Sequence, residues 1–378
     1  MTDAVPVLSV RDLHVCYHTA QGPFPVVDGV DLDVMPDEIF GIAGESGCGK
    51  STVVEGILRL VRTPGRIEAG SVRFLSRRGD AARAPDDGGA PLAPNAVDLL
   101  ALDGEAMRRM RWRSLAYVPQ GSMNALNPVL RVREQMIDCM ADHGAGDRAA
   151  CEGRLPELLQ AVGLSSSVLA AYPHQLSGGM RQRVIIAASI ALHPEVVVAD
   201  EPTTALDVHA QRLILQTMQK IRRQFGVAMI FVSHDLAVHA ELADRLGVMY
   251  AGQVVEIAPI ATIFAHPGHP YSWGLVHSLP QIGGQRRRLY GIPGLAPSPL
   301  HWPTGCRFHP RCPYAFDRCR QSPPPLRPTG DGHSVACHLY DPEESERLQQ
   351  AEAAMRAGGA GGARLREVAE SRGNTDGG

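Results

Sequence analysis

The chain has 378 residues, 44% of them hydrophobic, which is enough for one large domain with an appendage. A net charge of −3 and a pI near 6.6 lack the basic excess typical of nucleic-acid-binding proteins. No apolar stretch approaches the roughly 20 residues that a membrane span needs, and residues 1–13 lack the pattern of a signal peptide, so the sequence predicts a cytoplasmic protein.

Short strands and helices follow one another in the first two thirds of the chain. Alternating apolar residues within 7–15 and 26–34 predict antiparallel strands. The apolar run 39–43 predicts a strand, and one apolar face over 51–60 predicts a helix directly after it. The later predicted elements are a mostly helical stretch over 120–172, buried strands over 196–199 and 229–232, and a β-like segment over 245–258.

Composition changes mark the remaining segments. Residues 76–97 are rich in Gly, Ala, Pro and Asp, which predicts a surface insertion. From 259 the chain is rich in Pro, Gly and His and contains four clustered cysteines. A charged helical stretch follows, and a Gly-rich terminus comes after it, so we expect 342–378 to form a disordered tail.

The sequence GESGCGKS at 44–51 fits the phosphate-loop pattern G-x-x-x-x-G-K-[ST] at every fixed position. Its glycines let successive N–H groups surround a polyphosphate, and the helix that follows directs its positive end at the same charge. In this pattern Lys50 reaches the terminal phosphates and Ser51 ligates magnesium. The candidate nucleotide contacts are therefore Gly44, Glu45, Ser46, Gly47, Cys48, Gly49, Lys50, Ser51 and Thr52.

Two further strand ends carry polar residues. The apolar run 196–199 leads into Asp200 and Glu201, which would bring both carboxylates to the sheet edge beside the phosphate loop. There Asp200 is a candidate magnesium ligand, and Glu201 is a candidate to polarise the attacking water. His234 ends the next apolar strand and is a candidate contact of the γ-phosphate. Taken alone, each is better explained as an ordinary solvated strand end.

A second anion-binding helix start is predicted at LSGGMRQR, where Ser177, Gly178 and Gly179 open a helix. It lies more than a hundred residues beyond the phosphate loop, so one nucleotide need not contact both loops within one chain. Together with the preceding motifs, and in the same order, it resembles the signature of the ATP-binding cassette (ABC) ATPases. Met180 stands where many members of that family have glutamine.

The resemblance implies a fold and further site residues. The fold is the α/β P-loop ABC cassette over residues 7–258, with a RecA-like core, an antiparallel β subdomain and a helical signature subdomain at about 121–180. Tyr17 resembles the aromatic residue that stacks on adenine, and Gln120 the lid glutamine that senses magnesium. Asp207 resembles the end of the dimer-contact loop, and His234 the switch histidine. Two such cassettes dimerise head to tail and enclose ATP between the phosphate loop of one and the signature of the other.

The region after the cassette narrows the resemblance. HPGHPYSWGL at 266–275, IPGLAPSP at 292–299 and GCRFHPRCPYAFDRC at 305–319 resemble the C-terminal extension of the oligopeptide and dipeptide importer ATPases, here 259–341. MNALNP at 123–128 resembles the same family. This implies a peripheral protein at the cytoplasmic face of the membrane. Its partners would be a second ATPase subunit, two transmembrane permease subunits and an extracytoplasmic peptide-binding protein, with no nucleic acid. A soluble cassette acting on nucleic acid or ribosomes, and a nickel or glutathione importer, are the alternatives.

The four clustered cysteines have the spacing C-x5-C-x6-C-x17-C, without the close pairs that structural zinc favours. They are Cys306, Cys312, Cys319 and Cys337. The resemblance implies a 4Fe–4S cluster on these thiolates, while zinc and free thiols remain open. The nearby His309, His333 and His338 are expected to be solvated loop residues. The cofactors expected overall are thus ATP, Mg²⁺ and a 4Fe–4S cluster.

Overall fold

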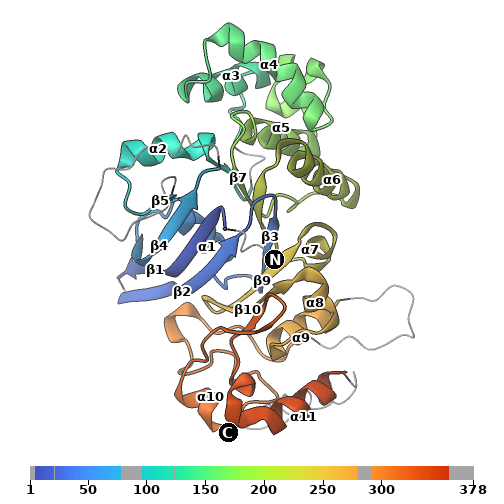
Figure 1. Ribbon diagram of the computed structural model, residues 1–378. Coiled ribbons are helices and arrows are strands. Elements are labelled where there is room, and N and C mark those ends of the chain that lie inside the picture. The colour runs from blue at the N-terminus through green and yellow to red at the C-terminus, as the bar shows by residue number, and fades with distance from the viewer. Residues whose placement is uncertain (1–4, 21, 78–95, 122–124, 280–290, 357–378) are drawn as a thin grey trace.

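A computed structural model describes residues 5–20, 22–77, 96–121, 125–279 and 291–356. Most of the surface insertion expected at 76–97, and the tail beyond 356, lie outside these ranges. Figure 1 shows a central sheet, an antiparallel sheet beside it, a group of helices above it, and the C-terminal segment below it.

The central sheet has eight strands in the order β11-β12-β10-β9-β3-β8-β7-β6. From β9 to β6 the neighbours run parallel, whereas β9, β10, β12 and β11 pair antiparallel. Strands β3, β7 and β8 are buried at every residue, which explains their continuous apolar runs. The carboxyl ends of β3, β8, β7 and β6 therefore share one edge, where ligands of such sheets bind. The strands are β3 Ile39–Ala43, β6 Leu115–Val118, β7 Val196–Asp200, β8 Ala228–Val232, β9 Arg245–Tyr250, β10 Gln253–Pro259, β11 Arg327–Gly330 and β12 His333–Val335.

The second sheet is antiparallel, in the order β2-β1-β4-β5. Its strands are β1 Leu8–Thr19, β2 Gly22–Val34, β4 Gly65–Leu75 and β5 Ala96–Asp98. Helix α1, Lys50–Ile57, packs against it so closely that a Cβ at Gly56 would lie 3.2 Å from a methyl group of Leu13. One apolar cluster joins both sheets and α1, so the phosphate loop lies on a single shared core.

Helices cover the other face of the central sheet and extend into a separate group. A second apolar cluster joins α3 to α6 with strands β6 to β8. In Figure 1, α3 and α4 lie at the end of the molecule opposite the C-terminal segment, with α5 between them and the sheet. The elements are α2 Gly104–Arg113, α3 Val132–Asp142, α4 Arg148–Ala161, η2 Ser166–Ala170, η3 Pro173–Gln175, α5 Gly178–Ser189, α6 Val208–Phe225 and α7 Leu236–Leu242.

The segment after 259 continues the central sheet. Strand β12 pairs with β10, and the fully buried carboxylate of Glu256 on β10 accepts hydrogen bonds from the N–H groups of Gly268 and His269 and from Nε2 of His333, at 2.7, 2.9 and 2.7 Å. The remaining elements are α8 Ile260–Ala265, α9 Pro270–His277, η4 Pro299–His301, α10 Asp317–Gln321, η5 His338–Tyr340, η6 Pro342–Glu344 and α11 Ser345–Arg356. None of the helices in the described ranges could cross a membrane.

The structure confirms the predicted strands around the phosphate loop, the helix after it, and the mostly helical stretch over 120–172. Two expectations are wrong. The disordered tail was expected from 342, but α11 is a packed helix: Met355 is buried and its carbonyl accepts a hydrogen bond from the Trp273 indole at 3.1 Å. His333 and His338 were expected to be solvated loop residues, but His333 lies on β12, where its side chain is 14% exposed and bonds the buried Glu256. His338 is buried between the Asp341 carboxylate and the Ser322 carbonyl.

Candidate nucleotide-binding site

The phosphate loop connects β3 to α1 at the carboxyl edge of the sheet. Gly49 has φ 102°, and a Cβ there would lie 2.6 Å from the Val26 carbonyl oxygen, so only glycine fits. Lys50 is 4% exposed, and its Nζ donates to the carbonyl oxygens of Gly44 at 2.9 Å and Glu45 at 3.1 Å. The ammonium group therefore closes the loop from inside and supplies its positive charge.

A hydroxyl and a carboxylate meet beside the loop. The hydroxyl of Ser51, in the first turn of α1, donates to Asp200 at the end of β7 over 3.2 Å. Burial raises the pKa of Asp200 to about 6, although the hydrogen bond from Ser51 opposes this shift. A hard cation would relieve the cost of this buried charge, and these two oxygen donors are of the kind that Mg²⁺ prefers. The residues present fit a magnesium ion.

Glu201 directly follows Asp200 and is held by three donors. Its carboxylate accepts from the Thr204 hydroxyl at 2.8 Å and from the Gln120 amide at 3.2 Å, and Nδ1 of His234 lies 3.2 Å from its other oxygen. Burial would raise the pKa of Glu201, but the bonds from Thr204 and His234 outweigh burial and lower it. The carboxylate is thus kept charged. Thr204 was not singled out by the sequence; it closes a turn on Glu201, because its N–H also donates to the Glu201 carbonyl at 3.1 Å.

The signature and the dimer-contact residue lie elsewhere. Ser177 caps α5 by accepting from the Met180 N–H at 3.3 Å. A Cβ at Gly179 would lie 3.1 Å from Ala210 in the first turn of α6, which Asp207 caps. The signature and the α6 start are therefore neighbours. Within the described ranges, no hydrogen bond or ion pair joins them to the phosphate loop.

Tyr17 lies on β1, where its ring stacks on Phe24 of the neighbouring strand with ring centroids 6.1 Å apart. Cys48 is buried in the loop, 4.0 Å from the Lys50 ammonium, as expected for a residue that fills a small space.

The C-terminal segment contacts the phosphate loop, which the sequence analysis missed. The N–H of Glu45 donates to the Tyr271 hydroxyl at 2.9 Å. The Glu45 carboxylate accepts two hydrogen bonds from Arg311, at 2.8 and 2.9 Å. An acid within a phosphate-binding loop is a signal that a basic partner lies nearby, and it could have prompted a search for one.

Comparisons with known proteins agree with this geometry. The ABC transporter family model matches residues 27–204, and the model of the oligopeptide/dipeptide transporter C-terminal region matches 255–319. The dipeptide transport ATP-binding protein DppD of Caldanaerobacter subterraneus is 38% identical over 89% of this chain and 97% of its own length. The oligopeptide transport ATP-binding protein AppD of Bacillus subtilis is 38% identical over 90% of this chain and 99% of its own.

The chain belongs to the ATP-binding proteins of the dipeptide and oligopeptide ABC transporters. As an ABC ATPase it also resembles solved cassettes. The dimeric ABC transporter cassette MJ0796 superposes with a TM-score of 0.55 at 25% identity, covering 67% of this chain and 98% of that one. A post-hydrolysis form of MJ0796 bound to ADP and Pi matches equally well.

The four clustered cysteines of this ABC ATPase lie close together in space. They are Cys306, Cys312, Cys319 and Cys337, and none forms a disulfide. Burial raises the pKa of Cys312 well above its usual value, and charge on each of the other three thiols would raise it further. The backbone N–H of Tyr314 opposes this rise in pKa by stabilising the Cys312 thiolate, and the N–H of Phe308 does the same for Cys306. In the described part of the chain, no group of three or more His, Cys, Asp or Glu side chains has the arrangement of a metal-ion site.

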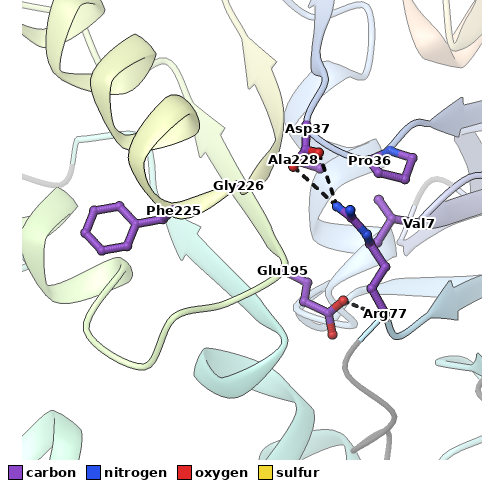
Figure 2. Close-up of a pocket in the computed structure, with 8 residues that line it drawn as sticks. All are labelled: Val7, Pro36, Asp37, Arg77, Glu195, Phe225, Gly226 and Ala228. Atoms are coloured by element: carbon purple, nitrogen blue, oxygen red, sulfur yellow. Dashed lines mark hydrogen bonds and ion pairs between the residues drawn. The ribbon is translucent and has the colours of Figure 1, made fainter.

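A hollow of about 410 Å³ lies at the opposite edge of the central sheet (Figure 2). Glu195 precedes β7 there, and Ala228 begins β8. Arg77 donates to Asp37 through its guanidinium and to Glu195 through its N–H, so the polar groups of this hollow satisfy one another. It faces away from the nucleotide site of the ABC ATPase, because parallel strands separate the two edges.

Proposed function

We propose that this chain is the ATP-hydrolysing subunit of an ABC importer that takes up dipeptides or oligopeptides. The observation that carries the proposal is the meeting of Lys50, Ser51, Asp200 and Glu201 at one edge of the central sheet, with the peptide-transporter extension packed against the same loop. The transported substrate and its specificity would reside on other subunits.

Each side chain has a role that follows from its position. Lys50 and the loop N–H groups bind the β- and γ-phosphates, and Ser51 with Asp200 holds the magnesium ion, which neutralises phosphate charge when bound. Glu201 is charged and fixed by Thr204, so it can orient and polarise the attacking water. His234, beside Glu201 and exposed on its other side, would contact the γ-phosphate. Gln120 follows β6 and bonds Glu201, so it would couple a change at this site to the position of the helical subdomain.

A second cassette completes the site in this proposal. Ser177, Gly178 and Gly179 offer the N–H groups at the start of α5, an anion-binding arrangement with no anionic partner among the residues that the structure describes. The resemblance to a dimeric cassette supports a head-to-tail pair in which ATP bridges the signature of one subunit and the phosphate loop of the other. Asp207, beside the signature, would then lie at the contact between subunits.

Permease subunits would dock on the helical side. An apolar groove of about 330 Å³ lies between the sheet and the helical group, lined among others by Leu60, Tyr117, Leu126, Met136 and Ile185. It begins near Gln120, so a permease helix seated there would sense the nucleotide site. In a peptide importer, an extracytoplasmic peptide-binding protein delivers the substrate to those permeases.

We also assign a 4Fe–4S cluster to Cys306, Cys312, Cys319 and Cys337. The support is chemical. Cys319 and Cys337 are buried and Cys306 and Cys312 are partly exposed, and desolvation by the surrounding protein together with charge on neighbouring thiols raises the pKa values of Cys306, Cys312 and Cys337. A cationic centre would stabilise the four thiolates, and backbone N–H groups already point at the sulfur atoms. The cluster would fix a Pro-rich segment that has a small core of its own.

The Glu201→Gln variant tests the hydrolytic assignment. The amide keeps the size and the bond to Thr204 but cannot take charge, so we expect turnover to fall about 10²–10³-fold while ATP still binds. Light scattering after gel filtration with ATP should then show a dimer. Glu241→Gln, at an exposed position on α7, is the matched control. Undiminished phosphate release by Glu201→Gln would remove Glu201 from this role, and an ATP-loaded monomer would contradict the composite site.

A further inference from the structure

The C-terminal segment holds the phosphate loop from outside at Glu45. Tyr271 on α9 accepts the Glu45 main-chain N–H, and Arg311 binds the side-chain carboxylate with both terminal nitrogens. Main chain and side chain of the second loop residue are thus both fixed by groups more than two hundred residues away. Neither contact is part of the phosphate-binding pattern itself.

Arg311 is rigidly placed. Its side chain is 7% exposed, its Nε donates to the Pro293 carbonyl at 2.8 Å, and its guanidinium lies over the rings of Tyr250 and Phe308. Those rings pack against each other and against Tyr271, with centroids 4.6–5.4 Å apart. Because the guanidinium is fixed before it meets Glu45, little conformational freedom is lost in forming the pair.

The pair also removes an electrostatic conflict. A free carboxylate in a loop that surrounds a triphosphate would repel the ligand, and inside a protein the repulsion acts with little screening. Bidentate pairing with Arg311 neutralises that charge at the loop and leaves Lys50 and the N–H groups to set the local field. Glu45 therefore lets the extension position the loop, and its negative charge does not weaken ATP binding while it is paired with Arg311.

We propose that Arg311 is a positioning residue of the nucleotide site, through which the cysteine-rich extension sets the affinity of the phosphate loop for ATP. Arg311 does not reach the nucleotide; it acts through Glu45. It lies between Cys306 and Cys312, so whatever orders that turn also orders the guanidinium. The inference rests on ATP binding at this loop and is independent of what the cysteines bind.

Binding of fluorescent mant-ATP with Mg²⁺ to the full-length chain tests the proposal. We expect Arg311→Gln to raise the Kd about tenfold, which corresponds to about 1.4 kcal/mol, while kcat at saturating ATP changes less than about threefold. Arg311→Lys keeps the charge but loses the paired geometry, so its Kd should lie between those of the parent protein and of Arg311→Gln. The double variant Arg311→Gln/Glu45→Gln should recover most of the lost affinity, because the unpaired carboxylate is gone.

Two arginines of the same segment serve as controls. Arg318 pairs within the extension with Asp341 and Glu343, at 3.2 and 2.9 Å, and Arg320 is exposed. Arg318→Gln, which removes these ion pairs of the extension without touching Glu45, and Arg320→Gln should each leave the Kd within twofold. A Kd for Arg311→Gln within twofold of the parent protein would overturn the proposal. So would a double variant no better than Arg311→Gln, or an Arg318→Gln variant that is equally impaired. Failure of every variant to bind mant-ATP, the parent included, would instead refute the nucleotide site.

Discussion

Replacement of Glu256 by glutamine removes the carboxylate that joins β10 to the extension. The carboxylate accepts three hydrogen bonds, from the N–H groups of Gly268 and His269 and from the His333 ring. A glutamine has one acceptor oxygen, so in either orientation its NH₂ group faces at least one donor. One buried N–H then loses its partner, at about 1–3 kcal/mol, and the bonds that remain lose charge assistance, at about 1 kcal/mol. We expect the Glu256→Gln variant to lose about 2–4 kcal/mol of stability.

Urea denaturation followed by circular dichroism measures this loss as a shift of the midpoint at an unchanged slope. Hydrogen exchange shows where the stability is lost, because the amides at the start of α9 should exchange faster in the variant while those of the rest of the sheet stay protected. Glu68→Gln is the matched control, since Glu68 is exposed and pairs with His18 at the surface. A loss for Glu256→Gln no larger than for Glu68→Gln, or faster exchange spread evenly over the sheet, would refute this account of how the extension is attached.

Three further outcomes are expected. Lys50→Ala should weaken ATP binding roughly 10–150-fold, from 1.5–3 kcal/mol for a hydrogen bond to a charged group, and normal affinity in a nucleotide titration would count against the loop assignment. Burial lowers the pKa values of His239 and His269 to about 4, so the unfolded chain binds protons that the folded chain excludes. Unfolding free energy should then fall by about 2 kcal/mol per histidine between pH 7.5 and pH 5, and His239→Asn should halve that slope. Protein purified without oxygen should absorb broadly near 400 nm (roughly, for thiolate-bound iron–sulfur). The Cys312→Ser variant should lose that absorption band, and the Cys16→Ser variant should keep it. A colourless parent protein with stoichiometric zinc would contradict the cluster.

Much of the nucleotide site could be predicted from the sequence because strand ends determine where its residues lie. Asp200 and His234 each follow a run of buried residues, and parallel pairing of β7 with β8 places those ends at one edge. A run of four or five apolar residues followed by polar residues is therefore enough to predict both a strand and the place of the side chains at its end. The phosphate loop is readable for the same reason, since a strand and a helix flank it.

The extension could be assigned by resemblance but its architecture could not be predicted. Its strands β11 and β12 are short, and Pro328 interrupts the first, so no alternating pattern marks them. The proline is tolerated because β11 is the edge strand of the sheet. Likewise the helix α11 carries too few apolar residues to be predicted as packed, yet Met355 and Ala351 lie on one side and cover Trp273.

The contacts that escaped prediction are those between distant segments, but one of them had a local sign. Glu45 places a negative charge in a loop whose ligand is itself highly charged, and no residue within the loop can neutralise it, since Lys50 already donates to two carbonyl groups. A cation from elsewhere in the chain can neutralise this charge by pairing with it. Arg311 supplies it from 266 residues away. An acid in a phosphate loop is therefore a reason to search for a basic partner, which in this chain Arg311 supplies from the cysteine-rich extension.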